Sequence, residues 1–93
     1  MPSHWMPVGR VVHYYDNLRV AIVEITGSEP LKRGDIVGYV LPDRFEQEPV
    51  ESIEVDHEPV ESVELGQKAG YETSLPRRLL PNNTIVYKVH KVQ

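Results

Sequence analysis

The sequence predicts an all-β fold, a single small six-stranded antiparallel β-barrel. Eight prolines and six glycines interrupt the 93 residues about every seven positions, so the segments between them have the length of strands. Inside these segments apolar residues alternate with polar ones or occur in β-branched runs. No window of 11 or more residues has apolar side chains at the 3.6-residue period of a helix.

The first two strands are expected at Val8–Tyr14 and Leu18–Ile25. The first contains adjacent valines and ends in aromatic residues, and the polar segment after it, residues 15–17, is typical of a short hairpin turn. In the second strand, Leu18, Val20 and Ile22 share one face. The other face is also largely apolar, as in a strand that is covered on both sides.

Two isolated apolar residues are expected to be buried anchors inside loops. Leu31 lies between a turn at Gly27–Pro30 and a second turn at Arg33–Gly34. Val60 is likewise surrounded by charged residues and turn formers. Each is predicted to fix its loop to the core.

The remaining strands follow the same criteria. The residues after Pro42 are expected to form a loop to about Gln47. Short apolar segments on either side of this loop and in the last third of the chain complete the six: Asp35–Leu41, Val50–Asp56, Gln67–Glu72 and Thr84–Val92.

Charge is distributed unevenly along the chain. The net charge is −4, but residues 43–65 hold nine acidic residues against Arg44 alone. Residues 66–93 hold five basic residues against Glu72. The acidic segment Asp43–Leu65 is therefore a candidate surface for docking a basic protein, whereas the last quarter is where the chain could contact phosphate.

Motifs for catalysis or cofactor binding are not found. The chain lacks the phosphate-loop and dinucleotide-binding glycine patterns, and no serine occupies a nucleophile elbow. It has no cysteine, and its four histidines have no metal-ligand spacing. We therefore expect no catalytic residues, no nucleotide, cofactor or metal, and no enzyme activity.

Four basic residues are the candidates for RNA binding. Arg77 and Arg78 are adjacent on a loop bounded by Pro76 and Pro81, where two guanidinium groups could contact phosphates. Lys88 and Lys91 are expected nearby.

Several motifs resemble domain 2 of the translational GTPases, the β-barrel of elongation factor Tu and initiation factor 2. They are Leu31-Lys32-Arg33-Gly34-Asp35, Val50-Glu51-Ser52-Ile53 and Gly66-Gln67-Lys68-Ala69-Gly70-Tyr71. Since only seven residues precede Val8, the chain is most similar to free-standing elongation-factor-like small proteins and to the barrel appended to some collagenase-like peptidases. The division that this resemblance implies is an N-terminal extension, residues 1–7, and a translation-factor domain 2-like barrel, residues 8–93.

The resemblance implies a noncatalytic binding module. Its expected partner is RNA or the ribosome, and the alternative is a protein partner that docks on the acidic segment Asp43–Leu65. No segment has the features of a membrane span or a signal peptide, so a cytoplasmic location is expected.

Overall fold

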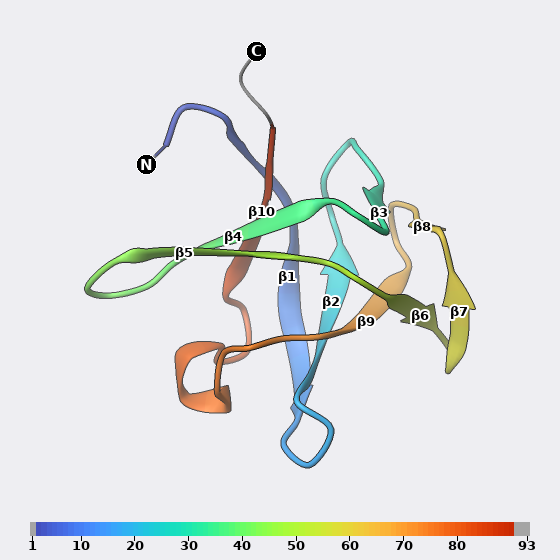
Figure 1. The fold of residues 1–93 in the computed structure, drawn as a ribbon. Helices are drawn as coiled ribbons and strands as arrows, with labels where there is room; N and C mark the ends of the chain where they lie inside the picture. Colours follow the sequence, from blue (N-terminus) through green and yellow to red (C-terminus); the bar gives the residue numbers. More distant parts are fainter. Residues whose placement is uncertain (1, 91–93) are drawn as a thin grey trace.

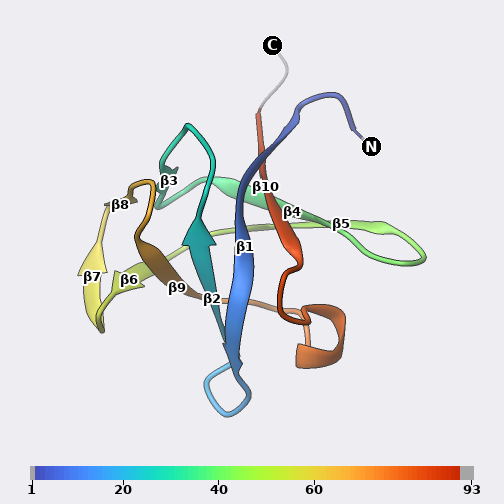
Figure 2. The ribbon, with the colours of Figure 1, turned by 180° about the vertical axis from the view of Figure 1, so that it is seen from behind.

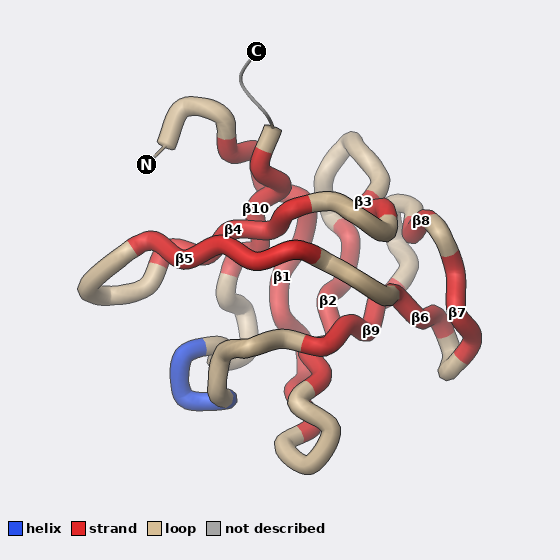
Figure 3. Tube along the Cα trace, viewed as in Figure 1, coloured by secondary structure: helices blue, strands red, loops and turns tan. Residues whose placement is uncertain are grey.

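The structure, a computed structural model, describes residues 2–90, and their regular elements are β-strands apart from one short 3-10 turn. Figure 3 shows this turn as the single helical segment among the strands. The all-β prediction is confirmed. No helix in the described part of the chain is long and apolar enough to cross a membrane. The elements are β1 (Trp5–Tyr15), β2 (Val20–Ile25), β3 (Leu31–Lys32), β4 (Ile36–Val40), β5 (Phe45–Pro49), β6 (Ile53–Val55), β7 (Glu58–Val60), β8 (Ser62–Val63), β9 (Lys68–Glu72), η1 (Arg77–Leu79) and β10 (Ile85–Val89).

Eight strands form one antiparallel sheet that bends over on itself. Their order is β5-β4-β10-β1-β2-β9-β6-β7, and β3 pairs with β8 in a separate two-stranded sheet. In Figure 1, β4 and β5 cross in front of β1, β2 and β10, and Figure 2 shows β1, β2 and β10 from the other side. The register of β1 shifts between Pro7 and Gly9 and between Val11 and His13, and such bulges bend a strand.

The prediction of a six-stranded barrel is wrong. Residues 2–90 hold ten strands, and the large sheet ends at two edges, β5 and β7, instead of closing. A groove of about 590 Å³ lies beside β5, with Glu48 and Pro49 on one side and Thr73 and Ser74 on the other. No ladder of backbone hydrogen bonds crosses this opening, and the side chain of Glu48 bridges it instead.

Most of the expected strands are found, with shifted ends. β1 begins at Trp5, three residues earlier than expected, and β2 begins at Val20 because Arg19 has the positive φ of a turn. The segment expected as one strand, Val50–Asp56, is regular only in β6. The end of the expected loop, from Phe45, is the start of β5, and this strand was missed because its inward-facing side chains are glutamates.

The core lies between the crossed layers of strands. Leu31 is fully buried in it, which confirms the predicted anchor. Val60 packs against the edge of the core but is only half-buried, so the predicted buried anchor is found there only in part. The largest fully buried side chains are Tyr39, Tyr71, Ile25, Leu31, Ile53, Leu80, Val8, Val11, Val23, Val37, Val50 and Val63.

Candidate interaction surfaces

Arg77 and Arg78 lie together on η1, which begins directly after Pro76. Both side chains are exposed, as a phosphate contact requires. The Nη1 atom of Arg77 lies 2.9 Å from Oδ2 of Asp16, in the turn between β1 and β2. One of the two adjacent guanidinium groups therefore already has a carboxylate partner.

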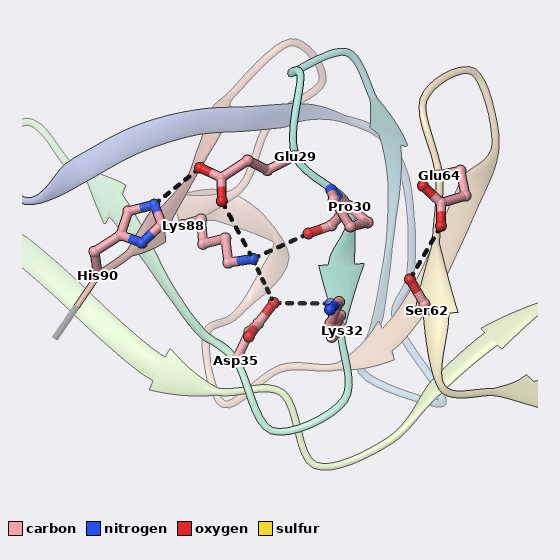
Figure 4. Close-up of polar contacts among 8 residues, drawn as sticks. All are labelled: Glu29, Pro30, Lys32, Asp35, Ser62, Glu64, Lys88 and His90. Carbon is pink, nitrogen blue, oxygen red and sulfur yellow. Dashed lines mark hydrogen bonds and ion pairs between the residues drawn. The ribbon is translucent and has the colours of Figure 1, made fainter.

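Lys88 lies near the opposite end of β10 from η1 and is surrounded by acceptors. Its side chain is only 14% exposed, and its Nζ atom is 3.3 Å from Oδ2 of Asp35 and 3.9 Å from Oε1 of Glu29. It also donates to the carbonyl oxygen of Pro30 at 3.2 Å (Figure 4). This cation holds the loop before β3 against β10 and has little surface to offer phosphate.

Two further contacts extend the Lys88 cluster. Nε2 of His90 lies 3.1 Å from Oε2 of Glu29, and Oδ2 of Asp35 accepts the backbone N–H of Lys32 at 2.8 Å (Figure 4). The fourth RNA-binding candidate, Lys91, lies outside the described residues. The three described candidates, Arg77, Arg78 and Lys88, thus do not form one basic surface.

The acidic segment is presented differently. Four acidic residues are exposed on the β6–β7 hairpin and the residues that lead into it: Glu51, Glu54, Asp56 and Glu58. We call these four residues the acidic hairpin. Within residues 2–90, none of the four makes an ion pair. The hairpin forms the β7 edge of the large sheet.

Three other acids of the segment have basic partners, whereas Glu64 is exposed and makes no ion pair with any described residue. Arg33 pairs with Glu61 at 3.1 Å, and Arg44 pairs with Asp43 at 3.1 Å and Glu46 at 2.6 Å. Of the five exposed acids in this segment that make no ion pair in the described part of the chain, four lie on the acidic hairpin.

Glu48 is the one acid of the segment that is buried. Its Oε2 atom accepts the hydroxyls of Tyr39 and Thr73, both at 2.6 Å. Its Oε1 atom accepts the backbone N–H and the hydroxyl of Ser74, at 2.8 and 2.9 Å. The Tyr39 hydroxyl has a single proton and donates it to Glu48. The hydroxyl of Tyr71 is therefore the donor in its 2.7 Å hydrogen bond to the Tyr39 oxygen. Burial is the main cause that raises the pKa of both tyrosines, so both remain neutral donors.

In the sequence, Glu48 differs in no visible way from the other members of the acidic segment. The signal that identifies it is its place in β5, where its register partner Val37 faces the core. The donors around the Glu48 carboxylate all come from the protein itself, and its four hydrogen bonds join the two sides of the groove. We therefore assign Glu48 a structural role and not a catalytic one. Within residues 2–90, no group of three histidine or acidic side chains could hold a metal ion.

No protein-family profile and no curated protein matches the chain. Two solved structures resemble its fold. The C-terminal domain of a putative U32 peptidase from Geobacillus thermoleovorans matches with a TM-score of 0.76 and 16% identity, over 97% of this chain and 98% of that one. The selenomethionine variant of the same domain matches with a TM-score of 0.72 and 15% identity, over 89% and 98%.

These neighbours correct the resemblance on which the sequence analysis relied. The matching folds are peptidase C-terminal domains and not domain 2 of a translation factor, so the identification as a translation-factor barrel is wrong. The short motifs that suggested it, such as Leu31–Asp35, mark turns and a buried anchor that different β folds can share.

Proposed function

We propose that this chain is a noncatalytic protein-docking domain that binds a basic surface of a partner protein through the acidic hairpin. The observation that carries the proposal is the contrast between the two charged regions. The four exposed carboxylates of the hairpin have no counter-charge within the described chain, whereas Arg77 and Lys88, two of the basic candidates, already have acidic partners. A basic protein surface complements such a hairpin, and nucleic acid would be repelled by it.

The fold comparisons support an accessory role. The two similar structures are described as the C-terminal domain of a larger protein, a putative U32 peptidase, so this fold occurs as a unit attached to another domain. By analogy, the partner in our proposal is a folded protein. The proposal retains a cytoplasmic location, because the chain has no cysteine with which a small secreted domain would be cross-linked.

The proposal is tested by co-purification with tagged wild-type protein and two variants, with and without nuclease treatment. One variant carries Glu51→Gln, Glu54→Gln and Glu58→Gln, and the other carries Arg77→Glu and Arg78→Glu. We expect one protein partner that resists nuclease, that binds the arginine variant as it binds the wild type, and that is lost from the glutamine variant. The captured protein is then purified and its direct binding to the three forms is measured.

Retention of RNA by the wild type, lost on nuclease treatment and lost from the arginine variant, would overturn the proposal in favour of nucleic-acid binding. A partner that binds the glutamine variant as tightly as the wild type would also overturn it.

A further inference from the structure

The outer face of β4, β5 and β10, together with the start of β1, carries no charged residue. Alternation along each strand and the register between strands place these side chains on the side away from Val37, Tyr39 and Val86, which are buried. The residues of this outer face are Trp5, Pro7, Ile36, Gly38, Val40, Phe45, Gln47, Pro49, Ile85, Tyr87 and Val89. In a chain that is 26% charged, eleven average positions would hold about three charged residues.

The outer face is also open to solvent. Phe45 is 50% exposed, Val40 45% and Ile85 43%. In a strand that simply faced water, alternation would place polar residues at these positions. No element of the described chain covers this face, so its composition needs a reason other than the packing of this domain.

Trp5 is held in a fixed position on the outer face. A Cβ atom at Gly38 would lie 2.6 to 2.8 Å from three atoms of the indole ring, so the ring rests directly against the backbone of β4. The ring of Phe45 lies edge-on to it at a centroid distance of 5.7 Å, and that of Tyr87 lies at 5.9 Å. A hollow of about 680 Å³ adjoins these rings. Trp5, Ile36, Phe45 and Val89 form its apolar side, and its rim is polar, with His4, Glu46, Gln47 and His90. A fixed aromatic beside a hollow is typical of the centre of a protein interface.

We propose that the outer face is a second docking surface and that its occupant is an apolar patch on a folded partner protein. This inference deepens the proposed function, on which it rests for the class of partner. Four strands spaced about 4.8 Å apart and about five residues long give a patch of roughly 300 Å². That is the size expected for the apolar centre of an interface that covers about 800 Å² of each partner.

Charge decides between protein and nucleic acid as the occupant. Bases could stack on Trp5, Phe45 and Tyr87, but stacked single strands also need cations along the phosphates. The face itself has none. Two cations border it, Arg10, the register partner of Ile85, and Arg44, and both are paired with carboxylates. An uncharged protein surface is the complement that this face fits.

The test uses the single tryptophan of the chain as a reporter. Purified wild type is titrated with the neutral apolar dye Nile red and, separately, with a single-stranded oligouridine, while the Trp5 emission is recorded. The face variant is Phe45→Glu, and the matched control is Leu18→Glu, because Leu18 is 68% exposed in the turn between β1 and β2, outside this face. Binding of the purified partner from the co-purification is then measured for the same three forms.

We expect Nile red to quench Trp5 in the wild type and in Leu18→Glu, and its affinity to fall at least fivefold in Phe45→Glu. We expect the partner protein to bind Phe45→Glu at least tenfold more weakly than Leu18→Glu. Quenching by oligouridine, or equal partner affinity for the two variants, would overturn the inference. If the glutamine variant of the acidic hairpin loses the partner and Phe45→Glu does not, the inference fails while the proposed function stands. If no protein partner binds the wild type, the proposed function fails as well.

Discussion

Glu48 shows how one side chain can take the place of strand pairing. It lies where a closed barrel would continue its ladder of hydrogen bonds, and its two oxygens together accept four hydrogen bonds, from Tyr39, Thr73 and Ser74. Hydrogen bonds to an ionised acceptor are stronger than those between neutral groups. The carboxylate therefore holds the segment after β9 against β5 across the groove.

The substitution Glu48→Gln tests this role. An amide has one acceptor oxygen, so the donors that face its NH2 group lose their acceptor inside the protein. We expect the free energy of unfolding to fall by roughly 2–3 kcal/mol, measured by urea denaturation. The same change at exposed Glu51 is the control and should alter it by less than about 0.5 kcal/mol. An equal change in the free energy of unfolding for the two substitutions would show that the hydrogen bonds of Glu48 do not stabilise the fold.

The buried tyrosine pair predicts how stability depends on pH. Burial raises the pKa of Tyr39 and Tyr71 in the folded protein, whereas the unfolded chain ionises them near pH 10. The unfolded state thus binds fewer protons than the folded state above pH 10. The stability that these groups contribute is complete below pH 10 and decreases as the pH rises further.

Tyr71→Phe removes one of the two groups and leaves Tyr39 hydrogen-bonded to Glu48. We expect the loss of stability between pH 10 and pH 11.5 to be shallower than in the wild type by up to about 1.4 kcal/mol per pH unit. Denaturation curves of the two proteins across this range supply the measurement. Parallel pH profiles would mean that Tyr71 ionises equally in the folded and unfolded chain.

At the scale of the elements, the side chains of the two apolar anchors, Leu31 and Val60, are buried to different extents. Leu31 in β3 is fully buried and pairs with Val63 of β8, while Val60 in β7 lies at the border of the core. We expect Leu31→Ala to lower the free energy of unfolding by roughly 2–4 kcal/mol, and Val60→Ala by about half as much. Chemical denaturation of both variants distinguishes the two cases. If Val60→Ala costs as much as Leu31→Ala, the half-buried position of Val60 is incorrect.

Strands whose inward positions are apolar could be predicted from the sequence. β2 and β9 have such positions, and the alternation found them. β10 was found by the alternation of Ile85, Tyr87 and Val89, although these residues lie on the outer face and its inward positions are Val86 and Lys88. β5 has Glu46 and Glu48 on its inner side, which reverses the usual pattern, and β3, β7 and β8 are too short for alternation to be visible. Sheet closure depends on contacts between distant segments, and the sequence carries no local signal for them.

Of the candidate surfaces, the acidic hairpin could be predicted from the sequence, and the pairing of the basic residues could not. Charge segregation along the chain identifies the acidic hairpin, because its residues are neighbours in sequence. The pairing of Arg77 with Asp16 joins residues 61 positions apart, and the ion pairs of Lys88 depend on the path of the loop before β3. Only the folded chain shows that these cations have partners.

For the whole molecule, the two proposed surfaces lie at opposite edges of the large sheet. The acidic hairpin belongs to the β7 edge, and the outer face extends to the β5 edge (Figure 1). The longest dimension of the domain is 33 Å. A partner that contacts both surfaces must therefore extend across much of the domain, as a folded protein can.

The central claim is that the place of the negative charge, and not the net charge, selects the partner. Two variants with the same net charge separate these alternatives. The hairpin variant Glu51→Gln, Glu54→Gln, Glu58→Gln and the control variant Ser3→Lys, Asn17→Lys, Asn82→Lys each change the net charge from −4 to −1. The three control positions are exposed and lie outside the acidic hairpin.

The most direct measurement is isothermal titration calorimetry of both variants and the wild type with the purified partner, across a series of salt concentrations. Three exposed charge contacts of about 0.5 kcal/mol each correspond to about a tenfold change in affinity at low salt. We predict that the hairpin variant binds about tenfold more weakly than the wild type and depends less on salt, while the control variant binds as the wild type does. Equal weakening of both variants, or an unchanged affinity of the hairpin variant, would contradict the account.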